Sequence, residues 1–111
     1  MAGSIQTQRT AVIANGATVS ASIYCGNKVA VALQMPAAFT GTTITFQGSY
    51  DGTTFQAVNV GGAAYSETVA ASLNIALDAT VLAGFRYLKV VSGSAEGAAR
   101  SVLVNLRRGD S

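Results

Sequence analysis

Apolar and polar residues alternate along most of this chain, which is the pattern of β-strands with one buried face. In residues 17–25 every second position is small or apolar, from Ala17 to Cys25, so we expect these side chains to face the core. Tyr24 lies at an alternate position and is predicted to face outward, together with Ser20. The run therefore predicts a half-buried strand.

The same pattern recurs between turn signals. In residues 28–35 we expect Val29, Val31, Leu33 and Met35 to face inward, and in residues 42–50 one face carries Ile44, Phe46, Gly48 and Tyr50. Pairs such as Asp51-Gly52 favour tight hairpin turns. Asp78 is placed to cap a short helical turn over residues 79–83. Further strands are predicted over residues 10–14, 53–58, 65–69, 73–77, 85–91 and 99–106.

Many short strands without a long helix indicate an all-β fold. We predict a two-sheet antiparallel β-sandwich of about eight strands, with the topology of a jelly roll. The length of 111 residues suits one domain, residues 1–111. We expect residues 1–9 to form a flexible N-terminal arm and residues 107–111 a polar C-terminal tail, because both segments are polar.

The composition is 50% hydrophobic and only 11% charged, against roughly 25% charged in an ordinary domain. Because charged residues are few, much of the surface is expected to consist of Thr, Ser, Ala and Gly. A neutral surface of this kind favours association, so we expect neighbouring proteins to cover much of it. The alternative is an ordinary, modestly soluble β domain.

Candidate catalytic and metal-binding residues are few. The chain has no histidine, so a cysteine nucleophile has no imidazole base, and the one cysteine, Cys25, is predicted to be a buried small side chain. Two acidic residues have a local explanation, Asp51 in a turn and Asp78 as a cap, and Glu96 and Asp110 lie in mobile-looking segments. Glu67 has no such explanation, and we expect it to be a solvated strand residue rather than a catalyst. We therefore expect no enzyme, no metal site and no cofactor.

The seven basic residues are scattered along the sequence, and only Arg107 and Arg108 are adjacent. Nucleic-acid-binding proteins normally cluster their basic residues on one face, so we expect no nucleic-acid partner. Residues 29–50 lack charge, but their alternation and Pro36 favour strands over a membrane helix, and no membrane partner is expected. As interface residues we predict the outward-facing Tyr24 and the basic residues near the two ends, Arg9, Arg107 and Arg108.

Two segments resemble a group of small tailed-bacteriophage proteins that are thought to be virion components. One is residues 45–55, with Ser49-Tyr50-Asp51-Gly52 before an aromatic residue, and the other runs from Leu77 through the segment 85–90, Phe-Arg-Tyr-Leu-Lys-Val. The same pairing is similar to galactose-binding-like and discoidin-like sandwiches. The resemblance covers residues 44–93, about half of the chain, and its motifs are structural.

This resemblance implies a jelly-roll protein of the virion, assembled in the host cytoplasm. The version we favour is a capsid decoration or cement protein, a homo-oligomer that bridges subunits of the major capsid protein or contacts other virion proteins. The alternatives are a tail or neck adaptor and a carbohydrate- or receptor-binding module of a phage fibre. The small loop residues depart from ligand-binding discoidin-like domains, so no binding residue is carried over.

Overall fold

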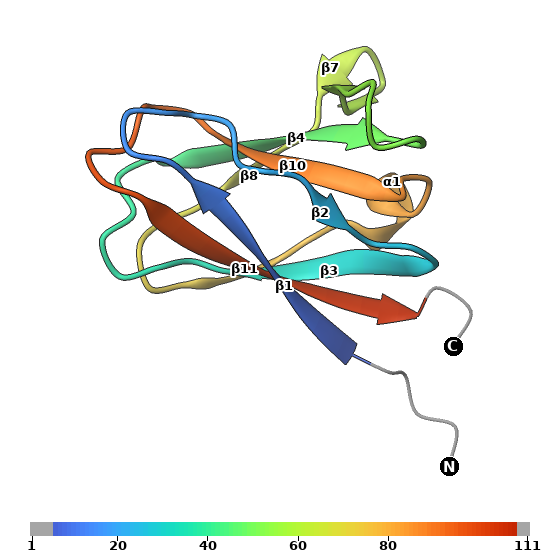
Figure 1. The fold of residues 1–111 in the computed structure, drawn as a ribbon, viewed down its shortest axis with the longest axis horizontal. Coiled ribbons are helices and arrows are strands. Elements are labelled where there is room, and N and C mark those ends of the chain that lie inside the picture. Colours follow the sequence, from blue (N-terminus) through green and yellow to red (C-terminus); the bar gives the residue numbers. More distant parts are fainter. Residues whose placement is uncertain (1–5, 109–111) are drawn as a thin grey trace.

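Two antiparallel sheets face each other in the computed structural model, which describes residues 6–108, with only the backbone described for Gln6 and Arg108 (Figure 1). The first sheet has the order β1-β11-β3-β9 and the second has the order β2-β10-β4, with β5 and β8 both on the far edge of β4. The first sheet comprises β1 (Gln6–Ile13), β11 (Arg100–Arg108), β3 (Lys28–Gln34) and β9 (Asn74–Ala76). The second comprises β2 (Ile23–Tyr24), β10 (Tyr87–Ser92), β4 (Thr43–Ser49), β5 (Gln56–Ala57) and β8 (Ser66–Thr68).

Two smaller elements complete the fold. The strands β6 (Asn59–Val60) and β7 (Ala63–Ala64) form a hairpin that projects beyond β4 in Figure 1. The helix α1 (Ala79–Leu82) is a single turn, and the Asp78 side chain caps it by accepting a hydrogen bond from the Thr80 N–H at 3.1 Å. The predicted helical turn and its cap are confirmed.

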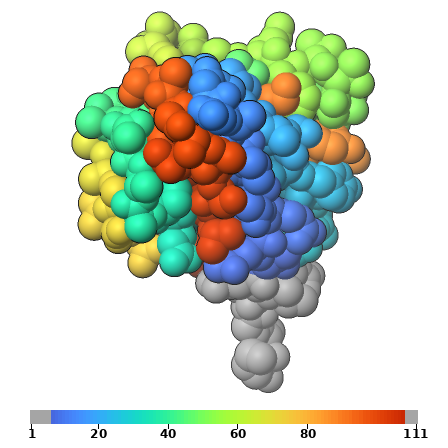
Figure 2. All heavy atoms as spheres, turned by 60° about the vertical axis from the view of Figure 1, so that its left-hand side comes forward, coloured from blue at the N-terminus to red at the C-terminus, as the bar shows by residue number. Residues whose placement is uncertain are grey.

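The chain crosses from one sheet to the other at nearly every step. It passes from β1 to β2, β3 and β4 in alternation. It adds β5 to the second sheet, makes the separate β6–β7 hairpin and returns to the second sheet at β8, and then alternates again through β9, β10 and β11. Apart from the two-residue β5, eight strands form two sheets, with the orders β1-β11-β3-β9 and β2-β10-β4-β8, which is the arrangement of a jelly roll. The predicted fold is therefore confirmed. Figure 2 shows the C-terminal strand, in red, beside the N-terminal strand, in blue, with which it pairs.

The inner faces of the two sheets meet in one core. Along β11 and β4 every second side chain points inward, as expected for strands with one buried face. The inward side chains are almost wholly removed from solvent, which is the main favourable contribution to folding. The largest are Ile13, Leu33, Ile44, Phe46, Leu82, Leu88, Val90, Val102, Val104 and Leu106.

A β-bulge in β3 changes which of its residues face the core. The register with β11 pairs Ala32 with Asn105 but Ala30 with Leu106, so Val31 has no partner residue on that side. Leu33 and Met35 are buried as predicted, but Ala30 is wholly buried, whereas Val29 and Val31 are only partly buried. The predicted inward position of Val31 is thus wrong, because the extra residue shifts the alternation by one, whereas Val29 is partly buried and packs against the core.

The predicted strand over residues 17–25 is also shorter than its pattern. Only Ile23 and Tyr24 form β2, and Ser20 is buried while Ala21 is exposed. The Ser20 hydroxyl accepts a hydrogen bond from the Val90 N–H at 2.9 Å and donates one to the Ala21 carbonyl, so its burial leaves no polar group unpaired. Cys25 is buried as predicted, and burial raises the pKa of its thiol to about 11, although the positive charge of Arg9 acts in the opposite direction.

The N-terminal arm predicted for residues 1–9 and the C-terminal tail predicted for residues 107–111 are both partly β-strand. Residues 6–9 lie in β1 and residues 107–108 in β11, where Gln6 is the partner of Arg107, so these residues belong to the sheet. Residues 1–5 and 109–111, which include Asp110, lie outside the described residues. Within residues 6–108 no helix is long and apolar enough to cross a membrane.

Glu96 is the largest departure from the sequence prediction, because it is 1% exposed rather than part of an open loop. Its Oε1 accepts hydrogen bonds from the Thr40 N–H at 3.1 Å and from Arg100 Nε at 3.0 Å. Its Oε2 accepts from the Gly41 N–H at 3.1 Å and from the Ser92 hydroxyl at 3.2 Å. Burial acts to raise the pKa of Glu96, but the bonds from Thr40, Arg100 and Gly41 outweigh it and hold the pKa below its usual value. The Glu96 carboxylate therefore connects the loop at residues 40–41 to the end of β10 and the start of β11, at one end of the sandwich.

Candidate functional site

Four aromatic rings gather at the other end of the sandwich, around the start of β10. The rings of Tyr24 and Tyr87 are 5.1 Å apart and tilted by 50°, because the register of β2 and β10 places the two residues opposite each other. The rings of Tyr50 and Phe85 are 5.7 Å apart and nearly parallel, at 22°. Tyr24 is 51% exposed and Tyr50 72% exposed, so each pair presents one ring to solvent. Exposed aromatic rings suit the binding of another molecule.

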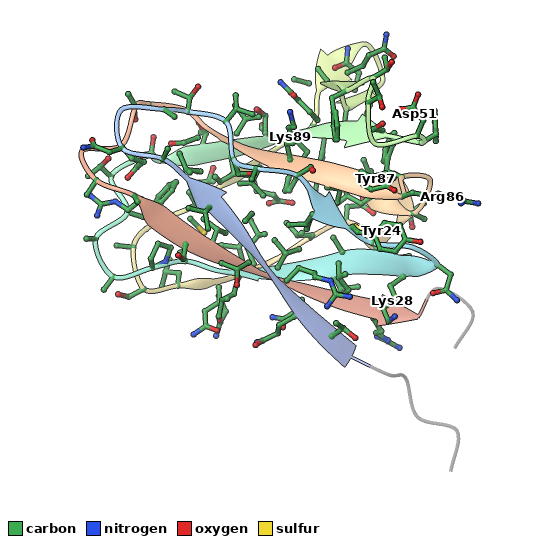
Figure 3. The ribbon with its side chains drawn as sticks, in the orientation of Figure 1. Tyr24, Lys28, Asp51, Arg86, Tyr87 and Lys89 are labelled. Carbon is green, nitrogen blue, oxygen red and sulfur yellow. The ribbon has the colours of Figure 1, made fainter. Side chains whose placement is uncertain are left out.

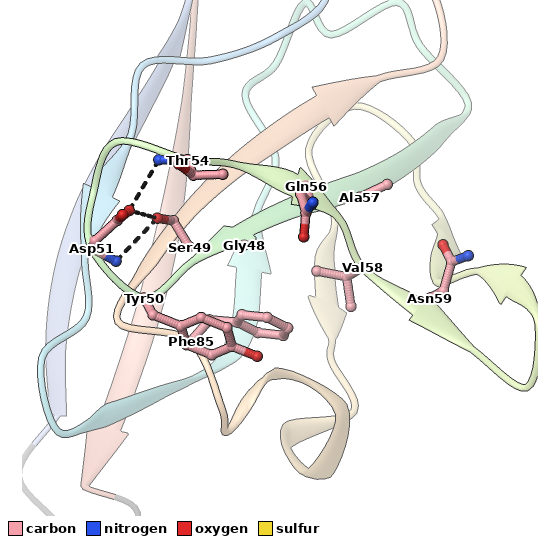
Figure 4. Close-up of a pocket in the computed structure, with 10 residues that line it drawn as sticks. All are labelled: Gly48, Ser49, Tyr50, Asp51, Thr54, Gln56, Ala57, Val58, Asn59 and Phe85. Carbon is pink, nitrogen blue, oxygen red and sulfur yellow. Dashed lines mark hydrogen bonds between the residues drawn. The ribbon is translucent and has the colours of Figure 1, made fainter.

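The Tyr50–Phe85 pair forms part of a pocket of about 300 Å³ (Figure 4). Gly48 makes room for it, because a side-chain carbon at this position would overlap the Phe85 ring. Around the rings lie hydroxyl, carboxylate and amide groups, a mixture typical of small ligand pockets. The other lining residues are Ser49, Asp51, Thr54, Gln56, Ala57, Val58 and Asn59.

Asp51 has a structural role in this pocket. Its Oδ1 accepts hydrogen bonds from the N–H groups of Thr54 and Thr53 and from the Ser49 hydroxyl, each at 2.9 Å. These bonds, led by that from Thr54, lower the pKa of Asp51. The carboxylate therefore stays ionised and holds the turn, as the sequence predicted for an Asp before a Gly.

A second hollow, of about 350 Å³, opens between the edges of the two sheets. We call it the basic hollow; it is lined by Arg9, Tyr24, Cys25, Gly26, Asn27, Lys28 and Arg86. Arg9 comes from β1, Lys28 from β3, and Arg86 precedes β10, so both sheets contribute a cation. In Figure 3 Tyr24, Lys28 and Arg86 lie at the same end of the molecule. Among residues 7–107, whose side chains the structure describes, no acidic side chain lines this hollow.

The four predicted interface residues are placed as follows. Tyr24 and Arg9 are exposed, and both line the basic hollow. Arg107 is exposed on β11, and Arg108 ends that strand beside Lys28, although its side chain is outside the described residues. Sequence reasoning missed Lys28 and Arg86, because only the folded strand order brings these two residues to one hollow.

The remaining acidic residues also have local partners. Glu67 accepts a hydrogen bond from the Tyr65 hydroxyl at 2.7 Å, and that hydroxyl accepts one from the Asp78 N–H at 2.8 Å. Burial raises the pKa of Tyr65 to about 12; the bond from the Asp78 N–H acts against this, while the bond to Glu67 and the negative charges of Glu67 and Asp78 add to it. Among the described residues, no three side chains of His, Cys, Asp or Glu come together as metal ligands.

The fold and its two hollows define a jelly-roll β-sandwich with an aromatic and basic end. No protein-family model matches the sequence, and no curated protein sequence matches it. Among solved structures, the chain is similar in fold to the SPBc2 prophage-derived protein YomS, with a TM-score of 0.56 and 13% sequence identity. The similarity covers 96% of this chain and 98% of YomS, so the two chains share the fold over nearly their whole length.

Proposed function

We propose that this chain is a non-enzymatic structural protein of a bacteriophage particle, and specifically a capsid decoration protein that bridges major capsid subunits. The observation that carries the proposal is the similarity of fold, over nearly the full length of both chains, to a protein encoded by a prophage. The low charge content of 11% agrees with a surface that neighbouring proteins cover.

The exposed apolar side chains are spread over several parts of the surface. Val12 lies on β1, Tyr24 on β2, Tyr50 after β4, Val60 in the projecting hairpin and Leu73 before β9, each between 41% and 72% exposed. Such a distribution suits small contacts with more than one neighbour. Repeated by the symmetry of a shell, and by self-association into a homo-oligomer, many weak contacts give stable attachment.

Cryo-electron microscopy of purified particles, with mass spectrometry to detect the chain, tests this proposal. We expect the jelly roll on the outer shell, contacting two or more major capsid subunits. Density at the neck or tail would refute the decoration role in favour of an adaptor. Absence of the chain from purified particles would refute the virion role altogether.

A carbohydrate- or receptor-binding module is a second candidate, and the Tyr50–Phe85 pocket is the observation that favours it. An exposed ring stacked on a second ring, with Gln56 and Asn59 beside it, has the parts of a sugar site. A glycan array with wild type and Tyr50→Ala tests it. A hit lost in Tyr50→Ala but kept in Tyr24→Ala, the matched exposed tyrosine, supports this function, and an array without hits removes it.

A further inference from the structure

We infer that the basic hollow binds an acidic segment of a partner protein, with Arg9, Lys28 and Arg86 contacting its carboxylates and Tyr24 packing against its chain. This inference rests on the proposed function, since it names the chemistry of the neighbour that the chain contacts. It goes further by assigning one site and four residues to that contact.

The charges around the basic hollow are all positive. Of the seven basic residues, Arg100 is paired with the buried Glu96, and Lys89 lies 4.4 Å above the ring of Phe55. Within the described residues, in contrast, the three cations of the basic hollow have no ion pair and no carboxylate lines the hollow. Three positive charges around one opening attract a ligand with several negative charges.

Backbone hydrogen bonds fix the walls of the basic hollow relative to each other. The Cys25 and Gly26 N–H groups donate to the Arg86 carbonyl at 2.6 and 3.4 Å, and the Lys28 N–H donates to the Cys25 carbonyl at 3.0 Å. The turn that carries Lys28 is thereby bonded to the segment that carries Arg86. A site whose walls are already held in place loses little entropy when a ligand binds.

The Tyr24 ring beside the three cations indicates which kind of ligand the hollow binds. Tyr24 lies against Gly26 and Tyr87, so its ring is held in place although half of it is exposed. Tyr and Arg are the residues most enriched where proteins bind proteins. A nucleic acid requires a longer series of phosphate contacts than one hollow with three cations provides. An acidic peptide matches both the charge and the single aromatic ring.

The test is a titration of isotope-labelled protein with N-acetyl-hexaglutamate, followed by the NMR shifts of the Gly26 and Asn27 amides. We expect saturable shifts, and about tenfold weaker binding in Arg86→Gln and in Lys28→Gln, the change expected for one charge-assisted contact. Lys89→Gln removes the same charge outside the hollow and should bind as wild type does. Unchanged spectra away from the substitution show that each variant is folded.

Three outcomes overturn the inference. The first is the absence of saturable shifts with hexaglutamate, and the second is equal weakening in Lys89→Gln, which would show general attraction only. The third is tighter binding of oligothymidylate or polygalacturonate, which would assign the hollow to nucleic acid or to an acidic glycan. Because the titration uses the isolated protein, its failure is distinct from absence of the chain from the particle.

Discussion

Replacing Glu96 with Gln is expected to destabilise the fold by about 3 kcal/mol, although the two side chains have nearly the same shape. Both donors to Oε1, the Thr40 N–H and Arg100 Nε, are unable to accept a hydrogen bond. The new amide nitrogen must therefore take the place of Oε2, where the Ser92 hydroxyl can accept but the Gly41 N–H cannot.

The magnitude comes from two losses at this site. An unpaired buried N–H at Gly41 costs about 1–3 kcal/mol, and Arg100 loses the charged partner of its hydrogen bond, which costs about another 1 kcal/mol. For a domain of this size about 3 kcal/mol lowers Tm by about 12 °C. Urea denaturation followed by circular dichroism gives the free energy of unfolding directly.

The pH dependence separates the charge of Glu96 from its shape. Because the pKa of Glu96 is lower in the folded than in the unfolded state, its ionised form stabilises the fold at neutral pH. This stability is lost as the pH falls below the ordinary Glu value and through the folded pKa. The difference between wild type and Glu96→Gln should therefore shrink in acid.

The matched control is Glu67→Gln, the same change at a partly buried carboxylate that accepts one hydrogen bond, from the Tyr65 hydroxyl. We expect a cost below about 1 kcal/mol there. A Glu96→Gln protein within about 0.5 kcal/mol of wild type, or a difference that stays constant down to acid pH, would refute the reasoning.

Three further predictions concern other buried groups. Gly48→Ala should cost about 1–3 kcal/mol in urea denaturation, because the added methyl group displaces the Phe85 ring, and an unchanged midpoint would contradict this. Cys25 should not react with a disulfide reagent at mildly alkaline pH until urea is added, because the thiol is buried and has a pKa of about 11; rapid labelling of the native protein would show otherwise. Tyr65→Phe should cost about 1 kcal/mol, because it removes the hydroxyl that donates to the Glu67 carboxylate and accepts from the Asp78 N–H, and a calorimetric scan with no lower Tm would count against it.

The strand pattern was enough to predict an all-β sandwich, because period-two alternation directly reflects a sheet with one buried face, whereas the jelly-roll strand order depends on which strands pair. It failed at Val31 and at Ser20 for identifiable reasons. A bulge depends on the partner strand, here the change of register at Asn105 and Leu106, and the partner is not visible in a local window. The burial of Ser20 depends on the Val90 N–H, which lies 70 residues away in the sequence.

The candidate site was predicted only in part for the same reason. Tyr24 and Arg9 could be proposed from local polarity and position, but the basic hollow exists only when Arg86 is brought beside Lys28. Glu96 could not be placed at all, since it stands in a stretch of small residues and its donors at Thr40 and Gly41 come from a distant loop. Side chains that act through tertiary contacts leave no local periodicity.

The position of β11 between β1 and β3 has a consequence during synthesis of the chain (Figure 1). Among the strands of this fold, the last to leave the ribosome is the one that joins β1 to the rest of its sheet, with Gln6 opposite Arg107. Until it emerges, β1 and β3 each have an open edge that can pair with another chain. Folding of the first sheet must therefore wait until β11 has been synthesised, and a nascent chain released before that point lacks a central strand and is exposed to aggregation.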